Sequence, residues 1–324
     1  MTWTDAIFHG VFLVLHRVAR CGLLTVRRCG LLFVALGVFM IGFTAGVFMY
    51  YILPLITSGI ASYWGFTMLT LGILFNILFN YALCVLTDPG KIRHHQDNDE
   101  YEFNNDSDED VEQGTLLQPS LRRRQNQETA YCRKCHIQRP IRAHHCSVCE
   151  VCIDHMDHHC PWINNCVGLH NYRYFCTFLF WLAAGCWYSA ILSFKPAVGD
   201  VSKEELVKYG NVFSSAILEL GPQAMMYCVF LIAASAGLLV SFLCGWHFYL
   251  VLTAQSSIEY QVNRSKRALR LNGGKIISPY CRGSPHKNWE AVFGPCRFKL
   301  LSLLPSRRPT PILLGSACSN KDIV

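Results

Sequence analysis

Four long apolar stretches dominate the hydrophobic pattern of the chain. They cover residues 31–53, 64–86, 176–194 and 225–253. An α-helix rises 1.5 Å per residue, so about 20 apolar residues cross the roughly 30 Å hydrocarbon core of a bilayer. The pattern therefore predicts four transmembrane helices. Asn76 and Asn80 lie four residues apart in the second stretch and predict hydrogen bonds to a neighbouring helix.

The segments between the apolar stretches differ in polarity. Residues 1–30 place apolar side chains roughly on one helical face and follow them with four arginines, which predicts an interfacial amphipathic helix rather than a cleaved signal peptide. Residues 87–131 form a linker whose acidic run, 97–112, is too polar to bury a core and predicts disorder. Residues 195–224 form a mixed-charge loop, and residues 254–324 form a basic tail.

Composition and charge place these segments relative to a membrane. The 324 residues are 52% hydrophobic with a mean hydropathy of +0.24, too apolar for an ordinary soluble domain. Lysine and arginine are dense in the N-terminal segment, the central region and the tail, whereas the loop at 54–63 carries no charge. By the positive-inside rule both termini and the central region face the cytosol, and four spans satisfy that parity.

Residues 132–175 carry the chemistry of the chain. They contain seven cysteines and seven histidines, including the pairs Cys132 with Cys135 and Cys146 with Cys149. Thiolate sulfur and imidazole nitrogen, in sets of four, are the ligands of tetrahedral zinc. The clustering of cysteine with histidine indicates metal in a reducing compartment rather than disulfides, although the chain has 17 cysteines in all.

One cysteine of this segment remains free. Two sites of three cysteines and one histidine would use six of the seven cysteines. Cys160 is the best candidate for the seventh, because it follows Asp157, His158 and His159. A thiol beside an imidazole and a carboxylate is the arrangement that produces a thiolate nucleophile.

The same segment resembles the catalytic domain of DHHC-type protein S-acyltransferases (palmitoyltransferases). The family pattern Cys-x2-Cys-x9-His-Cys-x2-Cys-x2-Cys-x4-Asp-His-His-Cys-x5-Cys-x4-Asn-x3-Phe is matched without a gap and ends at Asn171 and Phe175. Asp88-Pro89-Gly90 after the second span is similar to the family as well. Ser256-Ser257-Ile258-Glu259 stands where the family has Thr-Thr-x-Glu, and the retained hydroxyl predicts a hydrogen bond toward Asp157.

The resemblance continues into the tail, with two departures. Pro279-Tyr280 and the run from Lys287 to Gly294 resemble the C-terminal motif of the family. Ser278 replaces its leading asparagine, and the spacing between the tyrosine and the tryptophan is longer. The resemblance thus covers roughly residues 88–294.

The resemblance implies a role for each residue of the central segment. It implies two interleaved structural zinc sites, Cys132, Cys135, His145 and Cys152 in one and Cys146, Cys149, His159 and Cys166 in the other. Both are closed four-ligand sites; a Lewis-acid zinc with a role in the chemistry is the alternative. It also implies a catalytic trio, in which Asp157 orients His158 and His158 takes the proton of Cys160.

The implied reaction is transfer of a long-chain acyl group from acyl-CoA, such as palmitoyl-CoA, to a cysteine of a membrane-associated protein. Cys160 would carry the acyl group between two half-reactions. Trp162 either lines the acyl entrance or anchors the chain at the membrane interface. Four basic residues either bind CoA phosphates or form a solvated face: Arg133, Lys134, Arg139 and Arg142.

Small residues in the third span have two interpretations. Ala183, Ala184, Gly185 and Ser189 either line a cavity for the acyl chain or permit close helix packing. The cavity interpretation predicts that C18 acyl-CoA is accepted nearly as well as C16.

The expected fold is an all-α polytopic membrane protein, with four transmembrane helices and a small cytosolic zinc-binding Cys-rich domain between helices 2 and 3. The family implies the Golgi or endoplasmic reticulum membrane, with membrane-associated protein substrates that expose cytosolic cysteines. No nucleic-acid partner is expected. The last residues, Lys321 to Val324, are either a PDZ ligand or an idle tail.

Two other classes of function remain open from the sequence. A non-catalytic membrane adaptor would use the zinc module only as a protein-binding surface, but it would not need a free thiol beside a His-Asp pair. A transporter would need ionisable groups within its spans, and only His247 qualifies.

Overall fold

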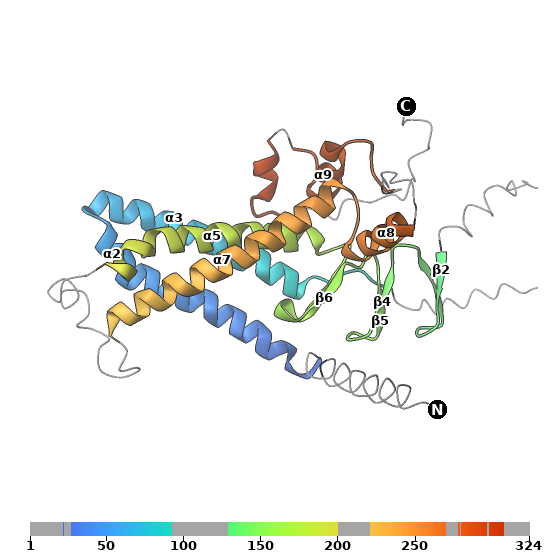
Figure 1. The fold of residues 1–324 in the computed structure, drawn as a ribbon, viewed down its shortest axis with the longest axis horizontal. Coiled ribbons are helices and arrows are strands. Elements are labelled where there is room, and N and C mark those ends of the chain that lie inside the picture. The colour runs from blue at the N-terminus through green and yellow to red at the C-terminus, as the bar shows by residue number, and fades with distance from the viewer. Residues whose placement is uncertain are drawn as a thin grey trace, which may run out of the picture.

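The computed structural model describes residues 22, 27–92, 129–199, 221–269, 278, 280–296 and 298–307. Four of the described helices are long and apolar enough to cross a membrane: Arg27–Ile56, Ile60–Leu86, Tyr172–Val198 and Gln223–Leu252. Figure 1 shows them as an elongated bundle, with the short strands gathered beyond one end of it. The predicted architecture, with a Cys-rich region between the second and third spans, is confirmed.

The spans are numbered α3 (Ile60–Leu86), α5 (Tyr172–Val198) and α7 (Pro222–Leu252), and the first span ends in the π-helical turn η1 (Phe48–Ile52) and α2 (Leu53–Ile56). Helices α3 and α5 pack closely at Gly185. A Cβ atom there would lie 2.9 Å from Ile77 Cδ1 and 3.1 Å from Ile73 Cγ2 of α3, so the absence of a side chain permits the contact.

The two asparagines of α3 differ from their prediction. Asn76 donates to the carbonyl of Gly72, at 2.7 Å, and Asn80 donates to that of Asn76, at 2.8 Å. Both bonds stay within the helix, because an amide side chain reaches the carbonyl one turn earlier without help from a neighbour. Polar contacts between α3 and α5 are made instead by Tyr188 Oη, which lies 2.9 Å from Thr70 Oγ1 and 3.4 Å from the Phe66 carbonyl oxygen.

The Cys-rich region adds three small antiparallel sheets to the helical bundle. In the first of these sheets of the described chain, β5 (Val151–Ile153) is central and pairs with both β1 (Lys91–Ile92) and β4 (His144–Cys146). The other two pair β2 (Thr129–Cys132) with β3 (Ile137–Pro140), and β6 (His158–Cys160) with β7 (Asn165–Val167). The turn after each Cys-x2-Cys pair contains a residue with positive φ, His136 at 56° and Glu150 at 57°. Strands of two to four residues carry too little alternation to be predicted from the sequence.

Side chains of this region cap the end of α3. Asn165 Nδ2 donates to the carbonyls of Cys84, at 3.1 Å, and Thr87, at 2.9 Å. Tyr81 donates its hydroxyl hydrogen to the Trp162 carbonyl, at 2.6 Å. The last carbonyls of a helix have no partner within it. These bonds therefore fix the position of the Cys-rich region on the membrane helices.

The tail folds back onto the end of α7 through α8 (Ser257–Leu269), α9 (Pro285–Phe293) and the 3-10 turn η3 (Lys299–Leu303). Asn288 Nδ2 donates to the Leu252 carbonyl at 2.8 Å. Ser278, which replaces the asparagine of the family motif, donates to the Ala254 carbonyl at 2.7 Å. This serine therefore still ties the tail to the end of the last span.

Several predicted features lie outside the described residues. These are most of the N-terminal amphipathic segment, the acidic run at 97–112, most of the loop at 195–224 and the C-terminal end with Val324.

Candidate functional site

The first set of predicted metal ligands comes together at one corner of the Cys-rich region. Cys132, at the end of β2, and Cys135, in the following turn, face His145 of β4 and Cys152 of β5. His145 Nδ1 lies 3.1 Å from Cys135 Sγ and 3.8 Å from Cys132 Sγ. Cys152 Sγ lies 3.8 Å from Cys135 Sγ. Strand pairing of His145 with Cys152 places these two ligands side by side.

The second set comes together where β6 meets the turn after β4. His159 Nδ1 lies 3.4 Å from Cys149 Sγ, 3.6 Å from Cys166 Sγ and 3.7 Å from Cys146 Sγ. His159 and Cys166 are direct partners in the pairing of β6 with β7. Cys146, at the end of β4, follows directly after a ligand of the first set, His145, so the two sets interleave along the chain.

Both sets have the dimensions of a tetrahedral zinc site. Zinc with Zn–S near 2.3 Å and Zn–N near 2.0–2.1 Å separates its ligand atoms by about 3.5–3.8 Å. Most of the distances between ligand atoms fall at or near this range. The residues of each set could hold a metal ion, and four protein ligands leave no position for water.

The Asp-His-Cys trio lies on and beside β6. His158 Nδ1 is 2.8 Å from Asp157 Oδ2, and Cys160 lies two positions after His158 on the same strand. Asp157 is 2% exposed and Cys160 is 8% exposed. His158 and His159 are adjacent in sequence but point to opposite faces of the strand, because side chains alternate along a β-strand. One face therefore carries a metal ligand and the other carries the candidate catalytic groups.

The tail supplies two further bonds to the Asp157 carboxylate. The Ser257 backbone N–H donates to Oδ1 at 2.7 Å, and the Ser257 hydroxyl donates to Oδ2 at 2.9 Å. The predicted hydrogen bond toward Asp157 is thus present. Glu259 accepts from the Ser256 N–H at 2.9 Å and from Arg142 Nε and Nη2 at 2.7 and 3.0 Å. These bonds hold the start of α8 against the Cys-rich region.

Electrostatics favour an ion pair between Asp157 and His158. Burial raises the pKa of Asp157, but the hydrogen bond and charge of His158 and the Ser257 N–H outweigh it and hold the pKa below its usual value. Burial lowers the pKa of His158, but hydrogen bonds to Asp157 and Cys160 outweigh it and raise the pKa to about 9. At neutral pH the His158 ring therefore carries a proton.

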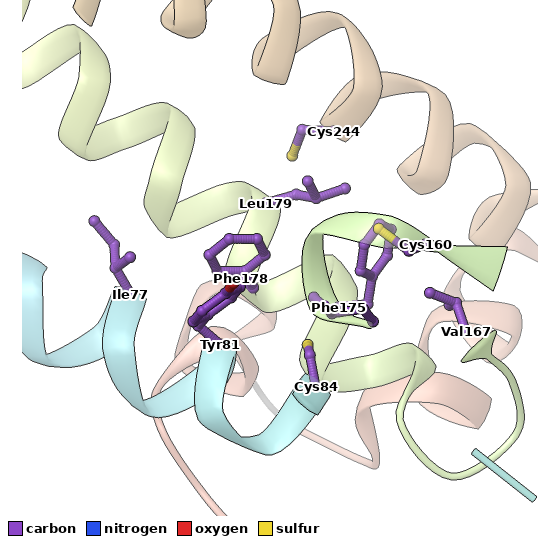
Figure 2. Packing of buried hydrophobic residues seen from close by; sticks show 10 residues of the cluster. Ile77, Tyr81, Cys84, Cys160, Val167, Phe175, Phe178, Leu179 and Cys244 are labelled. Carbon is purple, nitrogen blue, oxygen red and sulfur yellow. The ribbon is translucent and has the colours of Figure 1, made fainter. Parts of the chain in front are cut away.

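An apolar cavity of about 660 Å³ opens from this trio into the helical bundle. His158, Cys160 and Trp162 line its mouth, and Tyr188 and Ser189 of α5 lie farthest along its wall. Figure 2 shows Cys160 of β6 among buried side chains of α3, α5 and α7, which include Phe175 and Leu179 of α5. The volume falls within the range of small-molecule sites, about 300–1,000 Å³.

The cavity has the length of a long acyl chain. Phe175, whose ring lies 5.4 Å from that of His158, and Ser189 both line the cavity from α5. They are separated by about 21 Å of helix axis at 1.5 Å per residue. An extended chain advances about 1.2 Å per bond, so 16 to 18 carbons span roughly 18–20 Å. The cavity thus matches chains of this length.

The small residues of α5 divide between the two interpretations. Gly185 and Ser189 line the cavity, whereas Ala183 and Ala184 do not belong to its wall. The cavity interpretation therefore does not hold for Ala183 and Ala184. Gly185 and Ser189 are four positions apart and share a face of the helix. Ala184 precedes Gly185 by one position and is rotated about 100° from it around the helix axis.

The structure places the residue predicted at the acyl entrance and two of those predicted to bind CoA phosphates. Trp162 is about half exposed at the cavity mouth and contacts Phe33 edge-on at 5.6 Å. Arg142 is held by Glu259 and lies 4.1 Å over the Tyr280 ring. Lys134 donates to Ser147 at 3.1 Å.

One buried residue at the site was not expected to lie there. His247 of α7 is 1% exposed, and its ring centroid lies 5.0 Å from Phe175 and 5.8 Å from His158. The Tyr172 hydroxyl lies 3.3 Å from His247 Nδ1. The sequence signal was an ionisable residue near the end of an apolar span, which marks functional sites in membrane proteins. Its nearness to Asp157 and His158 follows only from the packing of α7 on α5.

Replacement of Ser257 by alanine is expected to slow enzyme acylation about tenfold. The variant loses the hydroxyl bond to Asp157 Oδ2 and keeps the backbone bond to Oδ1. A hydrogen bond to a charged group contributes about 1.5–3 kcal/mol, and each 1.4 kcal/mol is a factor of ten in rate. Single-turnover acylation measures the effect, and Ser257→Thr should restore the rate.

Ser265→Ala is the matched control on the same helix. Ser265 is exposed on α8, and its hydroxyl bonds only to the Gln261 carbonyl, at 3.1 Å. If Ser257→Ala and Ser265→Ala acylate equally fast, the hydroxyl bond to Asp157 has no part in the reaction.

Comparison with known proteins adds an independent finding. A family model described as DHHC palmitoyltransferase matches residues 125–264. The chain is 32% identical over 234 residues to "Probable protein S-acyltransferase 15" of Arabidopsis thaliana, an alignment that covers 72% of this chain and 80% of the relative. It is 31% identical over 243 residues to "Probable protein S-acyltransferase 16" of the same plant, 74% of each chain. It is 32% identical over 203 residues to "Palmitoyltransferase ZDHHC2" of Homo sapiens, 59% of this chain and 52% of the relative.

Proposed function

The chain belongs to the DHHC family of palmitoyltransferases, and from that premise we propose that it transfers long-chain acyl groups from acyl-CoA, such as palmitoyl-CoA, to cysteines of membrane-associated proteins. One observation carries the proposal. The Cys160 thiol lies at the junction of a buried Asp157–His158 pair and the mouth of an apolar cavity as long as a 16- to 18-carbon chain. A thioester carbonyl at this junction would have its acyl chain in the cavity and its CoA moiety outside.

In the first half-reaction Cys160 becomes acylated. Cys160 attacks as a thiolate, with its proton already on the His158 ring, and forms a bond to the carbonyl carbon of the acyl-CoA thioester. The bond between that carbon and the CoA sulfur breaks, and the CoA thiolate takes the proton from His158. Asp157 stabilises the imidazolium in between, because its carboxylate accepts the His158 Nδ1–H.

In the second half-reaction the acyl group moves to the substrate. The substrate cysteine gives its proton to His158 and attacks the Cys160 thioester. The Cys160 sulfur leaves as a thiolate while the proton stays on His158, which restores the starting state. One thioester replaces another of similar energy, so the protein contributes mainly position and a site that excludes water. The apolar walls of the cavity keep water from the buried chain.

We assign zinc to both four-ligand sets, with Cys132, Cys135, His145 and Cys152 in one and Cys146, Cys149, His159 and Cys166 in the other. The distances between ligand atoms support the assignment. Each metal would cross-link short strands that have little hydrophobic core of their own, and it would take no part in acyl transfer. Removal of the metals would therefore unfold the region that carries Cys160.

The proposed orientation places Cys160, the Cys-rich domain and both termini in the cytosol, in a Golgi or endoplasmic reticulum membrane. Four spans and the positive-inside distribution of lysine and arginine support the orientation. Basic residues of the Cys-rich domain, such as the exposed Arg133, would then meet the phosphates of cytosolic acyl-CoA. Substrates would present their cysteines at the same membrane surface.

Labelling of the purified protein with an alkyne-tagged palmitoyl-CoA tests the proposal. We expect a label on Cys160, mapped by peptide mass spectrometry and released by neutral hydroxylamine, as a thioester is. A membrane adaptor with the same zinc module would fold and bind metal but remain unlabelled. Folded, zinc-loaded protein without label on Cys160 would therefore favour the adaptor.

Side chains placed in the cavity wall are expected to shorten the preferred acyl chain in a graded way. Ser189→Phe fills the far end, about 21 Å from the level of Phe175, and should exclude C18 and C16 before C14. Gly185→Phe obstructs the cavity about 15 Å from that level and should exclude C14 as well. Unmodified protein should accept C18 nearly as well as C16, because both chains fit the cavity length.

Ala184→Phe is the matched control, since Ala184 lies on α5 outside the cavity wall. Competition between C14, C16 and C18 acyl-CoA measures the preference, and zinc content checks the fold. A Cβ atom at Gly185 crowds Ile77 of α3, so Ser189→Phe tests the prediction even where Gly185→Phe does not fold. An unchanged chain-length profile in folded Ser189→Phe would contradict the cavity as the acyl site.

A further inference from the structure

Outside the four spans, the exposed large apolar side chains of the described chain concentrate in one short segment. Phe298, Leu300, Leu301 and Leu304 are 61%, 73%, 50% and 46% exposed. We call residues 298–304, which contain η3, the C-terminal apolar segment. Four such side chains lie within seven residues, and exposed apolar side chains gathered in this way mark a contact with another apolar phase.

The C-terminal apolar segment lies beside α5. Trp181 Nε1–H donates to the Leu303 carbonyl at 2.8 Å, and Arg173 donates to Ser306 Oγ at 2.5 Å. Trp181 and Arg173 are separated by about 12 Å along the helix, and α5 begins at Tyr172. In Figure 1 the red end of the described chain lies next to the helical bundle, away from β2. Along the axis of α5, Leu303 therefore lies beside the apolar part of the span, and Ser306 lies beside the first turn of the helix.

Several polar groups of the segment have partners within the protein. Besides the Trp181 bond to Leu303, the Trp289 indole N–H donates to Ser302 Oγ at 3.1 Å, and Ser302 donates to the Lys299 carbonyl. The Leu301 N–H bonds to the Phe298 carbonyl at 3.0 Å. In water such bonds are optional, because solvent can replace them. At the depth of lipid chains, non-helical backbone is tolerated only where protein groups satisfy it.

Two exposed basic residues accompany the apolar side chains. Lys299 lies between Phe298 and Leu300, and Arg307 follows Leu304 by three residues. Long basic side chains extend toward the aqueous boundary while their neighbours stay in the apolar phase. Apolar side chains combined with such cations are typical of segments that lie in the membrane interface. Leu303, by contrast, is buried against Trp289 and Phe293 of α9 and so holds the segment on the protein.

We propose that residues 298–304 form an interfacial membrane anchor, whose Phe298, Leu300, Leu301 and Leu304 side chains insert among lipid acyl chains beside α5. We identify the partner of this surface as the bilayer for two reasons. The segment packs beside α5, a candidate membrane span, and its Leu303 bonds to Trp181, which lies within the apolar part of that span. The anchor is joined to α9 through Trp289, and α9 is joined to the end of α7 through Asn288. The tail that reaches Asp157 is thereby fixed at the membrane surface.

Photo-crosslinking in phosphatidylcholine vesicles tests the anchor. Phe298 and, in a second variant, Leu300 are replaced by p-benzoylphenylalanine in the full-length protein, and lipid adducts are detected by intact mass. Phe242, which is 80% exposed on α7, receives the same residue as a positive control. Tyr131, a similarly exposed aromatic residue on β2, is the negative control. We expect adducts at Phe298 and Leu300 as at Phe242, and none at Tyr131.

A double variant, Leu300→Asp with Leu301→Asp, completes the test. It should lower the lipid adduct at Phe298 roughly tenfold, because carboxylates are strongly disfavoured among acyl chains. Lipid adducts at Phe242 but none at Phe298 or Leu300, in protein that retains its zinc, would overturn the anchor. Adducts from these positions to another protein in cell membranes, in place of lipid, would also overturn it and identify a protein-binding surface instead.

Discussion

Replacement of Cys160 by serine is expected to abolish acyl transfer while both metal sites stay filled. A serine hydroxyl is a far weaker nucleophile than a thiolate at neutral pH, so the acylation rate should fall on the order of 10³-fold or more. Cys160 belongs to neither set of four metal ligands, so zinc content should not change. Hydroxylamine-labile acyl label and zinc, each measured per chain on purified protein, give the two readouts.

Cys228→Ser is the matched control for this substitution. Cys228 is an exposed cysteine of α7 that contacts neither metal set nor the cavity wall within the described residues. It should keep both the label and the zinc. A Cys160→Ser variant that loses zinc would show that the ligand assignment is wrong. A folded variant that still forms a labile acyl-enzyme would show that the nucleophile is another cysteine.

The residues of the two predicted metal sets and of the Asp157, His158 and Cys160 trio lie together in the structure because both groupings depend on local spacing. Cys132 and Cys135 are separated by one tight turn, and Asp157, His158 and Cys160 lie on one short strand or directly before it. Alternation along that strand then separates His158 from His159 without any long-range information. The choice between interleaved and sequential metal sites needed the family resemblance, because many pairings satisfy the same spacing.

The cavity and its neighbours could not be predicted in the same way. Several positions on α5 carry small residues, and only the rotation of the helix decides that Gly185 faces the cavity and Ala184 does not. The rotation depends on packing against α3 and α7, which no local pattern contains. His247 is another example, because a residue of α7 reaches His158 only after the helices assemble. The short strands were also missed, since hydrogen bonds and metal ligands rather than apolar alternation define them.

The neighbouring histidines are expected to respond in different ways to alanine. His159→Ala removes a ligand whose Nδ1 lies 3.4–3.7 Å from three cysteine sulfurs. Structural zinc contributes about 10–16 kcal/mol in small zinc domains, as much as the whole stability of a typical domain. The variant should therefore lose zinc from this site and unfold the Cys-rich region. Zinc per chain and resistance to proteolysis measure both effects.

His158→Ala should instead keep both zincs and acylate about 10²–10⁴-fold more slowly, the range for loss of a general base. Its stability should also respond differently to pH. The pKa of His158 is raised from 6.5 to about 9, so the pair with Asp157 contributes stability that is fully present below pH 6.5 and is lost as the pH rises through about 9. Over that interval the unmodified protein should lose an increment of stability that His158→Ala lacks.

Thermal unfolding of both proteins across this pH range, in the same membrane mimetic, measures the increment as a difference in Tm. The stability of the two metal sites changes alike in both proteins, so their difference isolates the His158–Asp157 pair. If the two histidine variants proved equally folded and equally slow, the two faces of β6 would not have separate roles. A constant Tm difference across the range would mean that His158 is uncharged in the folded protein, and that it acts as a neutral base from the start of the reaction rather than in an ion pair with Asp157.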